Sequence, residues 1–287
     1  MKKMKRLLIL PIVVILFSSN LFSQTKVACI GNSITYGYGI ENRNENSYPA
    51  QLSMFLGEKY IVENFGISAR TLLKNGNLPY WNEQEYKNAL DWKPDIVIIK
   101  LGTNDSKLKL NWEQHQNEFE DDYKEMIQSF KNLDSSPEIW ICMIVPAYRD
   151  IWDISDSTIQ FGVNPKIINI AREEMVNLID LYHTMSGKPE MFLDDGIHPN
   201  AEGAKEMAKI IYNIIISAKP EIKIIGSELI APDAISYQWY RDGRIIKKED
   251  NGNKKNFKTK EKGQYHVAVK INPDDETRKI SAVAEIK

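Results

Sequence analysis

Residues 95–105 have the sequence DIVIIKLGTND. The apolar run in this stretch is almost continuous, which is typical of a strand covered on both faces of a sheet. A turn of small and polar residues follows at 102–105. Because parallel sheets are covered by helices on both faces, this stretch predicts a central strand of an α/β domain, with polar side chains at its carboxyl end.

Short apolar stretches and longer amphipathic stretches alternate on both sides of this strand. Strands are expected at 27–30, 61–65, 95–101, 139–145 and 178–182, and helices at 47–56, 83–90, 112–133, 165–176 and 201–216. Strands that alternate with helices predict a parallel sheet with helices on both faces.

The pattern changes after the last helix. The stretch 235–240 (ISYQWY) alternates between the two faces of a strand, Asp242-Gly243 is a turn signal, and 264–270 alternates again. Residues 221–287 are therefore expected to form a small all-β domain beside a larger domain of residues 24–220. The larger domain is expected to fold by itself.

The small domain resembles an immunoglobulin-like sandwich. Trp239 fits the buried Trp of that fold, and Tyr265 fits the Tyr two residues before its second Cys. Val267 stands where that Cys would be, so the resemblance is to a module without the disulfide. The alternative is a β-domain that serves as a secretion signal.

The N-terminus has the order of a secretory signal peptide. Basic residues at positions 2–6 precede an apolar run at 7–17 and a small polar segment at 18–20. The apolar run is short for a bilayer span. We expect a signal peptide at 1–23 and an exported mature protein, periplasmic or extracellular, without a membrane span. An uncleaved anchor is the alternative.

Composition narrows the classes of partner and cofactor. The formal net charge is -2, with 37 basic and 39 acidic residues, which argues against a nucleic-acid partner. Cys29 and Cys142 each lie in an apolar strand-like run. They could form a disulfide in an exported protein, but we favour buried free thiols. No sequence pattern indicates a metal site, and no cofactor is expected.

The first candidate for chemistry is Ser33, in the GNSIT stretch at 31–35 that follows the first strand. Open α/β sheets build their sites at the carboxyl ends of strands, which suits a nucleophile. Thr35 replaces the last Gly of the G-x-S-x-G elbow, so this is a different motif. The alternative is a Ser that only caps a helix.

The second candidate is the DGIHPN stretch at 195–200. A nucleophilic Ser needs a base, and the base needs a carboxylate to fix its tautomer. His198 and Asp195 lie three residues apart around a Gly, which lets the carboxylate reach Nδ1 of the ring. Asp194 is the second choice for this carboxylate. The alternative is that Asp195 and Asn200 only form turns and cap the following helix.

Two further stretches offer donors for an oxyanion. The side-chain amide of Asn104, in the GTND turn, is a suitable N–H donor for the negative charge that acyl transfer produces. Asp105 beside it would cap or brace that turn. Gly66, after the second strand, would let a backbone N–H approach a substrate closely. Asn is also common in tight turns for local reasons.

These four stretches, in this chain order, resemble the SGNH (GDSL-like) hydrolase family across residues 26–216. The resemblance implies a flavodoxin-like three-layer α/β/α sandwich with a parallel five-stranded sheet of order 2-1-3-4-5, and metal-free ester hydrolysis. It implies Ser33 as nucleophile, His198 as base and Asp195 as orienting carboxylate. Ser33, Gly66 and Asn104 would form the oxyanion hole. Asn32 departs from the Asp that many members carry.

The sequence favours an O-acetyl carbohydrate ester as substrate. Aromatic residues in loops near predicted strand ends suit sugar stacking, although each could be a packing residue instead; the candidates are Tyr36, Tyr38, Tyr80, Trp81, Tyr148 and Trp152, of which Tyr36, Trp81, Tyr148 and Trp152 are assigned to substrate binding. A lipid or thioester hydrolase and a non-catalytic glycan-binding protein remain alternatives. His115, His183 and His266 are expected to be structural or surface residues.

Overall fold

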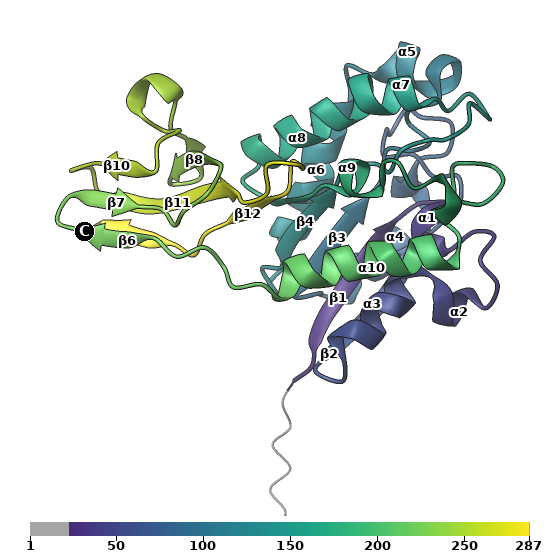
Figure 1. Ribbon diagram of the computed structural model, residues 1–287, viewed down its shortest axis with the longest axis horizontal. Coiled ribbons are helices and arrows are strands. Elements are labelled where there is room, and N and C mark those ends of the chain that lie inside the picture. Colours follow the sequence, from purple (N-terminus) through teal and green to yellow (C-terminus); the bar gives the residue numbers. More distant parts are fainter. Residues whose placement is uncertain (1–22, 287) are drawn as a thin grey trace, which may run out of the picture.

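The computed structural model describes residues 23–286. Figure 1 shows a sheet with helices on both faces, from which the C-terminal strands extend to one side. The expected signal peptide at 1–23 lies outside the described residues except for its last position. No helix within residues 23–286 is long and apolar enough to cross a membrane.

The centre of the fold is a set of parallel strands in the order β2-β1-β3-β4-β5. Their bounds are β1 (Thr25–Gly31), β2 (Tyr60–Gly66), β3 (Ile96–Lys100), β4 (Glu138–Cys142) and β5 (Asn177–Ile179). All five residues of β3 are buried, in keeping with a strand covered on both faces. The carboxyl ends of these strands meet at one edge of the sheet, where the predicted site residues follow them.

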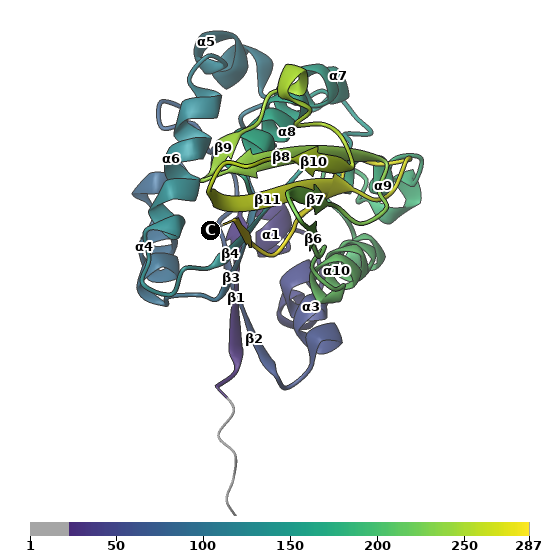
Figure 2. The same cartoon turned by 90° about the vertical axis from the view of Figure 1, so that its left-hand side faces the viewer.

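Helices cover both faces of these strands, as Figure 2 shows. One face packs against α4 (Gln84–Asp91), α6 (Phe119–Lys131) and α8 (Asn164–Glu173), and the other against α3 (Tyr48–Leu56), α9 (Leu181–Met185) and α10 (Ala201–Ile216). Side chains of β3 alternate between the two apolar clusters, as a strand requires: Val97 and Ile99 lie in one, Ile96 and Ile98 in the other.

Shorter helical segments connect these elements. They are α1 (Ser33–Tyr36), α2 (Arg43–Asn46), η1 (Tyr80–Asn82), η2 (Leu108–Trp112), α5 (Glu113–His115), α7 (Asp156–Thr158), η3 (Ile159–Val163), η4 (Pro189–Met191) and η5 (Lys248–Asp250). The single helix predicted at 112–133 is thus broken into α5 and α6.

The two cysteines are buried free thiols, as predicted.

The sheet does not end at β5. It continues through β12 (Arg278–Ile280), β11 (Gly263–Lys270), β8 (Ser236–Arg241) and β9 (Arg244–Ile245), and β13 (Ala284–Ile286) pairs with β11. Arg278 pairs antiparallel with Leu178, which joins the two parts. The five parallel strands are therefore part of a mixed, 10-stranded sheet, which corrects the expectation of a sheet confined to the larger domain.

The C-terminal strands also enclose a core of their own. A 3-stranded sheet of β6 (Lys223–Ile225), β7 (Glu228–Ile230) and β10 (Asn256–Lys258) contributes Leu229 and Phe257 to an apolar cluster with Trp239 and Tyr265. Trp239 is fully buried and its Nε1 donates to the Lys254 carbonyl at 2.8 Å. The two aromatic residues singled out in the sequence are thus core residues of this region.

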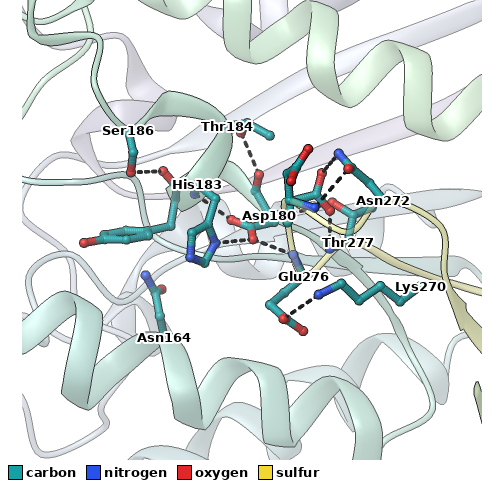
Figure 3. Close-up of polar contacts among 12 residues, drawn as sticks. Asn164, Asp180, His183, Thr184, Ser186, Lys270, Asn272, Glu276 and Thr277 are labelled. Carbon is teal, nitrogen blue, oxygen red and sulfur yellow. Dashed lines mark hydrogen bonds and ion pairs between the residues drawn. The ribbon is translucent and has the colours of Figure 1, made fainter. Parts of the chain in front are cut away.

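Polar contacts attach this region to the helix-covered part (Figure 3). Asp180, fully buried, caps α9 by accepting the His183 N–H at 2.9 Å, and its other oxygen accepts the Glu276 N–H at 2.7 Å. The Asp180 N–H in turn donates to Thr277 Oγ1 at 3.1 Å. At the far end of α10, Lys279 Nζ donates to the Ile214 carbonyl at 3.1 Å, so a cation satisfies the helix C-terminus.

A chain of residues 24–220 is expected to unfold at a temperature several degrees lower than a chain of residues 24–287. The truncation removes the Glu276 N–H from a buried carboxylate and uncovers the edge of β5. Thermal unfolding of the two chains measures this. Asp180→Asn in the longer chain is the control, because it weakens the polar contacts and leaves the edge paired. Equal unfolding temperatures for both chains would contradict the coupling.

Candidate active site

Ser33 is the first residue of α1, directly after β1. Asn32 is the N-cap of this short helix, and its Oδ1 accepts the Ile34 N–H at 3.1 Å. Asn and Asp are equivalent caps, so the departure from the family pattern at this position keeps the local geometry. Ser33 is 7% exposed, so its hydroxyl sits in a nearly dry site at the carboxyl edge of the sheet.

Two glycines make this turn possible through close packing. A Cβ on Gly31 would lie 2.0 Å from Thr35 Oγ1 and 2.8 Å from the Lys100 carbonyl. A Cβ on Gly66 would lie 2.3 Å from the Tyr36 backbone nitrogen. Strands β1, β2 and β3 therefore approach the turn that carries the candidate nucleophile Ser33 (residues 32–36, called the nucleophile turn) so closely that only glycine fits at these positions.

The DGIHPN loop holds the second part of the site. Asp195 Oδ1 accepts the N–H groups of Ile197 at 2.8 Å and His198 at 2.9 Å, which fixes the loop. Asn200 then caps α10 by accepting the Gly203 N–H at 3.0 Å. Asp195 and Asn200 therefore have the turn and capping roles considered as alternatives, but Asp195 also contacts the His198 ring.

Ser33, His198 and Asp195 form one hydrogen-bonded chain. Ser33 Oγ lies 2.8 Å from His198 Nε2, and His198 Nδ1 lies 2.7 Å from Asp195 Oδ2. Asp194 is exposed, whereas Asp195 points into the site. Of the two neighbouring carboxylates, Asp195 is therefore the one that can fix the tautomer of the ring.

Burial and hydrogen bonds shift both ionisable partners. Burial lowers the pKa of His198 below its ordinary value of 6.5, although Asp195 opposes this by stabilising the charged ring. Burial alone would raise the pKa of Asp195, but the His198 and Ile197 N–H groups and the ring outweigh it, so its pKa lies below the ordinary value. At neutral pH the pair is a neutral imidazole beside a carboxylate, the form that accepts a proton from serine.

The GTND turn follows β3 and is braced by its own carboxylate. Asp105 is fully buried and accepts the N–H groups of Leu73 at 2.7 Å and Leu72 at 3.0 Å. Burial raises the pKa of Asp105 to about 6, against the lowering effect of these N–H groups. Asn104 Nδ2 donates to the Arg70 carbonyl at 3.1 Å. An amide nitrogen carries two hydrogens, so one remains for a ligand.

The predicted role of Gly66 as an N–H donor to the substrate needs correction. Its N–H already donates to the side-chain oxygen of Asn64 at 2.9 Å. Gly66 serves close packing against the nucleophile turn instead. The nearby backbone group that sequence reasoning missed is Ala69, which has a left-handed φ of 69° and an N–H without an acceptor within residues 23–286. A left-handed alanine is a strained position of the kind found at functional sites, but only a structure reveals its φ.

Aromatic residues flank the imidazole. The Tyr38 ring centroid lies 4.7 Å from that of His198, and the Trp152 centroid lies 5.9 Å from it. Both rings are about half exposed, at 47% and 50%. Trp152 and Asp153 have left-handed φ values of 55° and 66°, and Asp153 Oδ2 fixes this loop by accepting the Lys109 N–H at 2.7 Å. The loop thus holds Trp152 beside the His198 ring.

The other aromatic candidates have packing contacts. The Arg43 guanidinium covers the Tyr36 ring at 3.9 Å. Trp81 donates from Nε1 to the Leu72 carbonyl at 2.6 Å and packs on the Tyr86 ring. The Tyr148 hydroxyl donates to the Met185 carbonyl at 2.8 Å, with the ring against Phe192. Tyr36, Trp81 and Tyr148 are therefore partly buried and held by packing contacts, and Trp152 is the predicted platform that lies beside the His198 ring.

The remaining histidines contact groups outside this site. His115 Nδ1 lies 3.1 Å from Glu118, and His266 Nδ1 lies 3.2 Å from the Ser281 carbonyl. His183 Nδ1 lies 2.6 Å from Asp180 Oδ2, with the same three-residue spacing as His198 and Asp195.

Across residues 23–286, no group of three or more His, Cys, Asp or Glu side chains is arranged to hold a metal ion.

A Ser–His–Asp chain at the carboxyl edge of parallel strands is the arrangement of an α/β serine hydrolase. The chain belongs to the GDSL-like Lipase/Acylhydrolase family, whose pattern matches residues 29–206.

Relatives within this class are esterases by name. The chain is 43% identical over 203 residues to an acetylxylan esterase of Xylanibacter ruminicola, covering 65% of this chain and 42% of that protein. It is 27% identical over 193 residues to an arylesterase of Vibrio mimicus, covering 65% and 86%. Est24, a carbohydrate acetylesterase from Sinorhizobium meliloti, superposes with a TM-score of 0.56 at 19% identity, covering 67% of this chain and 98% of that one. The chain spans less than half of the acetylxylan esterase, and the likeness to Est24 is one of fold.

Gly66→Ala is expected to lower both the unfolding temperature and ester turnover, because the added Cβ collides with the backbone of the nucleophile turn. The variant keeps the Gly66 N–H. Thermal unfolding and kcat for a small soluble ester are the measurements. Unchanged values for both would show that the turn has room for a side chain and that close packing is not the role of this residue.

Proposed function

We propose that this protein is a serine esterase that removes O-acetyl groups from carbohydrates. The observation that carries the proposal is the hydrogen-bonded chain from Ser33 through His198 to Asp195. The name of the acetylxylan esterase relative and the exposed aromatic rings beside the triad support the choice of substrate.

In the proposed mechanism, Ser33 Oγ attacks the ester carbonyl carbon while His198 Nε2 takes the hydroxyl proton. Asp195 holds Nδ1 and stabilises the imidazolium that forms. The tetrahedral intermediate collapses when the C–O bond to the sugar breaks and His198 returns the proton to the departing alkoxide. Water then attacks the acetyl-serine with His198 again as base, which releases acetate and restores Ser33.

The negative charge on the former carbonyl oxygen needs donors that are fixed in advance. We assign this role to the Asn104 side chain, to the Ser33 N–H and, in place of Gly66, to the Ala69 N–H. Asn104 touches the turn that contains Ala69, since it bonds to the Arg70 carbonyl, and Asp105 braces the same segment. Preorganised donors in a buried site are worth several kcal/mol to a transition state, about 2.7–4 for one donor.

The rest of the predicted organisation is proposed with this function. We propose an exported protein with a signal peptide at 1–23, a catalytic region at 24–220 and an immunoglobulin-like module at 221–287. The basic-then-apolar order of residues 2–20 supports export. The buried Trp239 and Tyr265 support the module.

Ser33→Ala and His198→Ala are each expected to reduce kcat by roughly 10⁶-fold, and the double variant should lose little more, because the residues act as a unit. Asp195→Asn is expected to cost roughly 10⁴-fold. Asp194→Asn is the matched control, since its carboxylate is exposed. Turnover of p-nitrophenyl acetate by the folded variants measures this. Substantial activity of Ser33→Ala would favour a different chemistry, and inactive wild-type protein that binds glycans would favour a binding function.

Acetyl esters are expected to give the highest kcat/KM, with a steep fall by butyrate or hexanoate. Trp152→Ala should reduce acetate release from an O-acetylated xylan more than turnover of p-nitrophenyl acetate, because the ring is placed to hold the sugar rather than the acyl group. Acetate release and chain-length profiles measure the two effects. Rates that rise towards octanoate would instead indicate a lipid or thioester hydrolase.

A further inference from the structure

Lys100 is a charged residue at the centre of the fold that the proposed mechanism does not use. It is the last residue of β3 and is fully buried. Its Nζ has no hydrogen-bond partner among residues 23–286. Burying a cation without a hydrogen bond is costly, and replacing such a charge by an apolar side chain often stabilises a protein. A lysine at this position therefore calls for an explanation beyond packing.

Its place in the sheet puts Lys100 close to the segment that carries Ser33. Lys100 pairs in register with Gly31, two residues before Ser33. By strand alternation its side chain shares a face with Ile96 and Ile98, the face covered by α3 and α10. Helix α10 begins three residues after His198. The buried Lys100 side chain thus extends from the sheet towards the helix layer that the 195–200 loop leads into.

The titratable groups around Lys100 do not neutralise it. Cys142 on β4 interacts with Lys100, and Cys29 on β1 and Tyr48 on α3 interact with Cys142 in turn; burial raises the pKa of Cys142 to about 12 and also raises the pKa of Cys29 and of Tyr48. All three are neutral at physiological pH. Burial lowers the pKa of Lys100 itself to about 8, so the amine remains mostly protonated at neutral and acid pH.

The charge of Lys100 acts on His198. After burial, and against the attraction of Asp195, the Lys100 ammonium is the further group that lowers the pKa of the imidazole. A cation disfavours a second cation nearby, so protonation of the ring becomes harder while Lys100 is charged.

We propose that the buried ammonium of Lys100 keeps His198 in its neutral, proton-accepting form and so extends ester hydrolysis to lower pH. Lys100 acts through His198 and is a positioning residue, not a catalytic one. Activity is lost as pH falls and His198 gains a proton, and Lys100 moves that loss to lower pH. Above about pH 8 Lys100 loses its charge, but His198 is already neutral there, so the alkaline side is little affected.

Lys100→Met tests this, because methionine fills a similar volume without charge. The His198 ring is titrated by NMR through its carbon-bound protons, with His198→Asn used to assign the signal. The midpoint is expected to move to higher pH in Lys100→Met. The control is Lys93→Met, which removes an exposed lysine paired with Asp134 and is expected to leave the midpoint unmoved.

The pH profile of kcat/KM for p-nitrophenyl acetate is the second measurement, and it alone rests on the proposed function. Lys100→Met is expected to lose roughly two- to tenfold more rate on the acid side than at the plateau. Lys100→Arg, which keeps the charge, should retain the wild-type profile. A wild-type protein without esterase activity would contradict the proposed function. The NMR titration would still test the effect of Lys100 on His198.

An unmoved His198 midpoint in Lys100→Met would overturn the proposal. If Lys100→Met unfolds at a higher temperature while its His198 midpoint stays unmoved, the only effect of the buried charge is to lower the stability of the fold. If Lys100→Met does not fold, Lys100→Gln serves for the same measurements, with the same expected displacement and the same overturning result.

Discussion

The hydrogen bond between Ser33 Oγ and His198 Nε2 joins residues 165 positions apart, and it forms only if the rest of the fold brings their two segments together. It requires the end of β1 and the loop before α10 to meet at one edge of the sheet. Parallel strands provide this edge, and α10, packed beside α3 on one face, fixes where the loop begins. Gly31 and Gly66 complete the constraint, because any Cβ there would push the neighbouring segments away from the nucleophile turn.

Around this bond, burial gives a few charges a large effect. Asp195 favours the protonated ring, while desolvation and the Lys100 ammonium disfavour it, so the basicity of His198 is a balance of opposing terms. Asp105 shows the same principle in a structural role: a fully buried carboxylate, held by the Leu72 and Leu73 N–H groups, braces the segment beside Asn104. In water these charges would be screened and would matter little.

The C-terminal strands continue the sheet whose first strand leads to Ser33. The pairing of β12 with β5, the buried Asp180 and the capping Lys279 join the C-terminal region to the helix-covered part at separate points. Asp180 and His183 also repeat the Asp-x-x-His hydrogen bond that Asp195 and His198 make. That repeat shows that a spacing of three residues is a local property of the backbone, which becomes part of a triad only where a serine meets the second ring nitrogen.

The sequence by itself determined the alternation of strands and helices, the polar stretches at the strand ends, and the spacing that lets Asp195 reach the His198 ring, because these depend on local periodicity and short-range reach. It also predicted the last helix, 201–216, at the observed bounds. The tertiary structure decided the rest. Trp152 and Trp81 lie in segments of similar sequence character, but only folding exposes the Trp152 ring beside His198 and partly buries the Trp81 ring against Tyr86. The occupied N–H of Gly66, the left-handed Ala69 and the single-pair junction of β12 with β5 also depend on contacts between distant segments. Local propensity contains no information on such contacts, because their energies arise only when the segments meet.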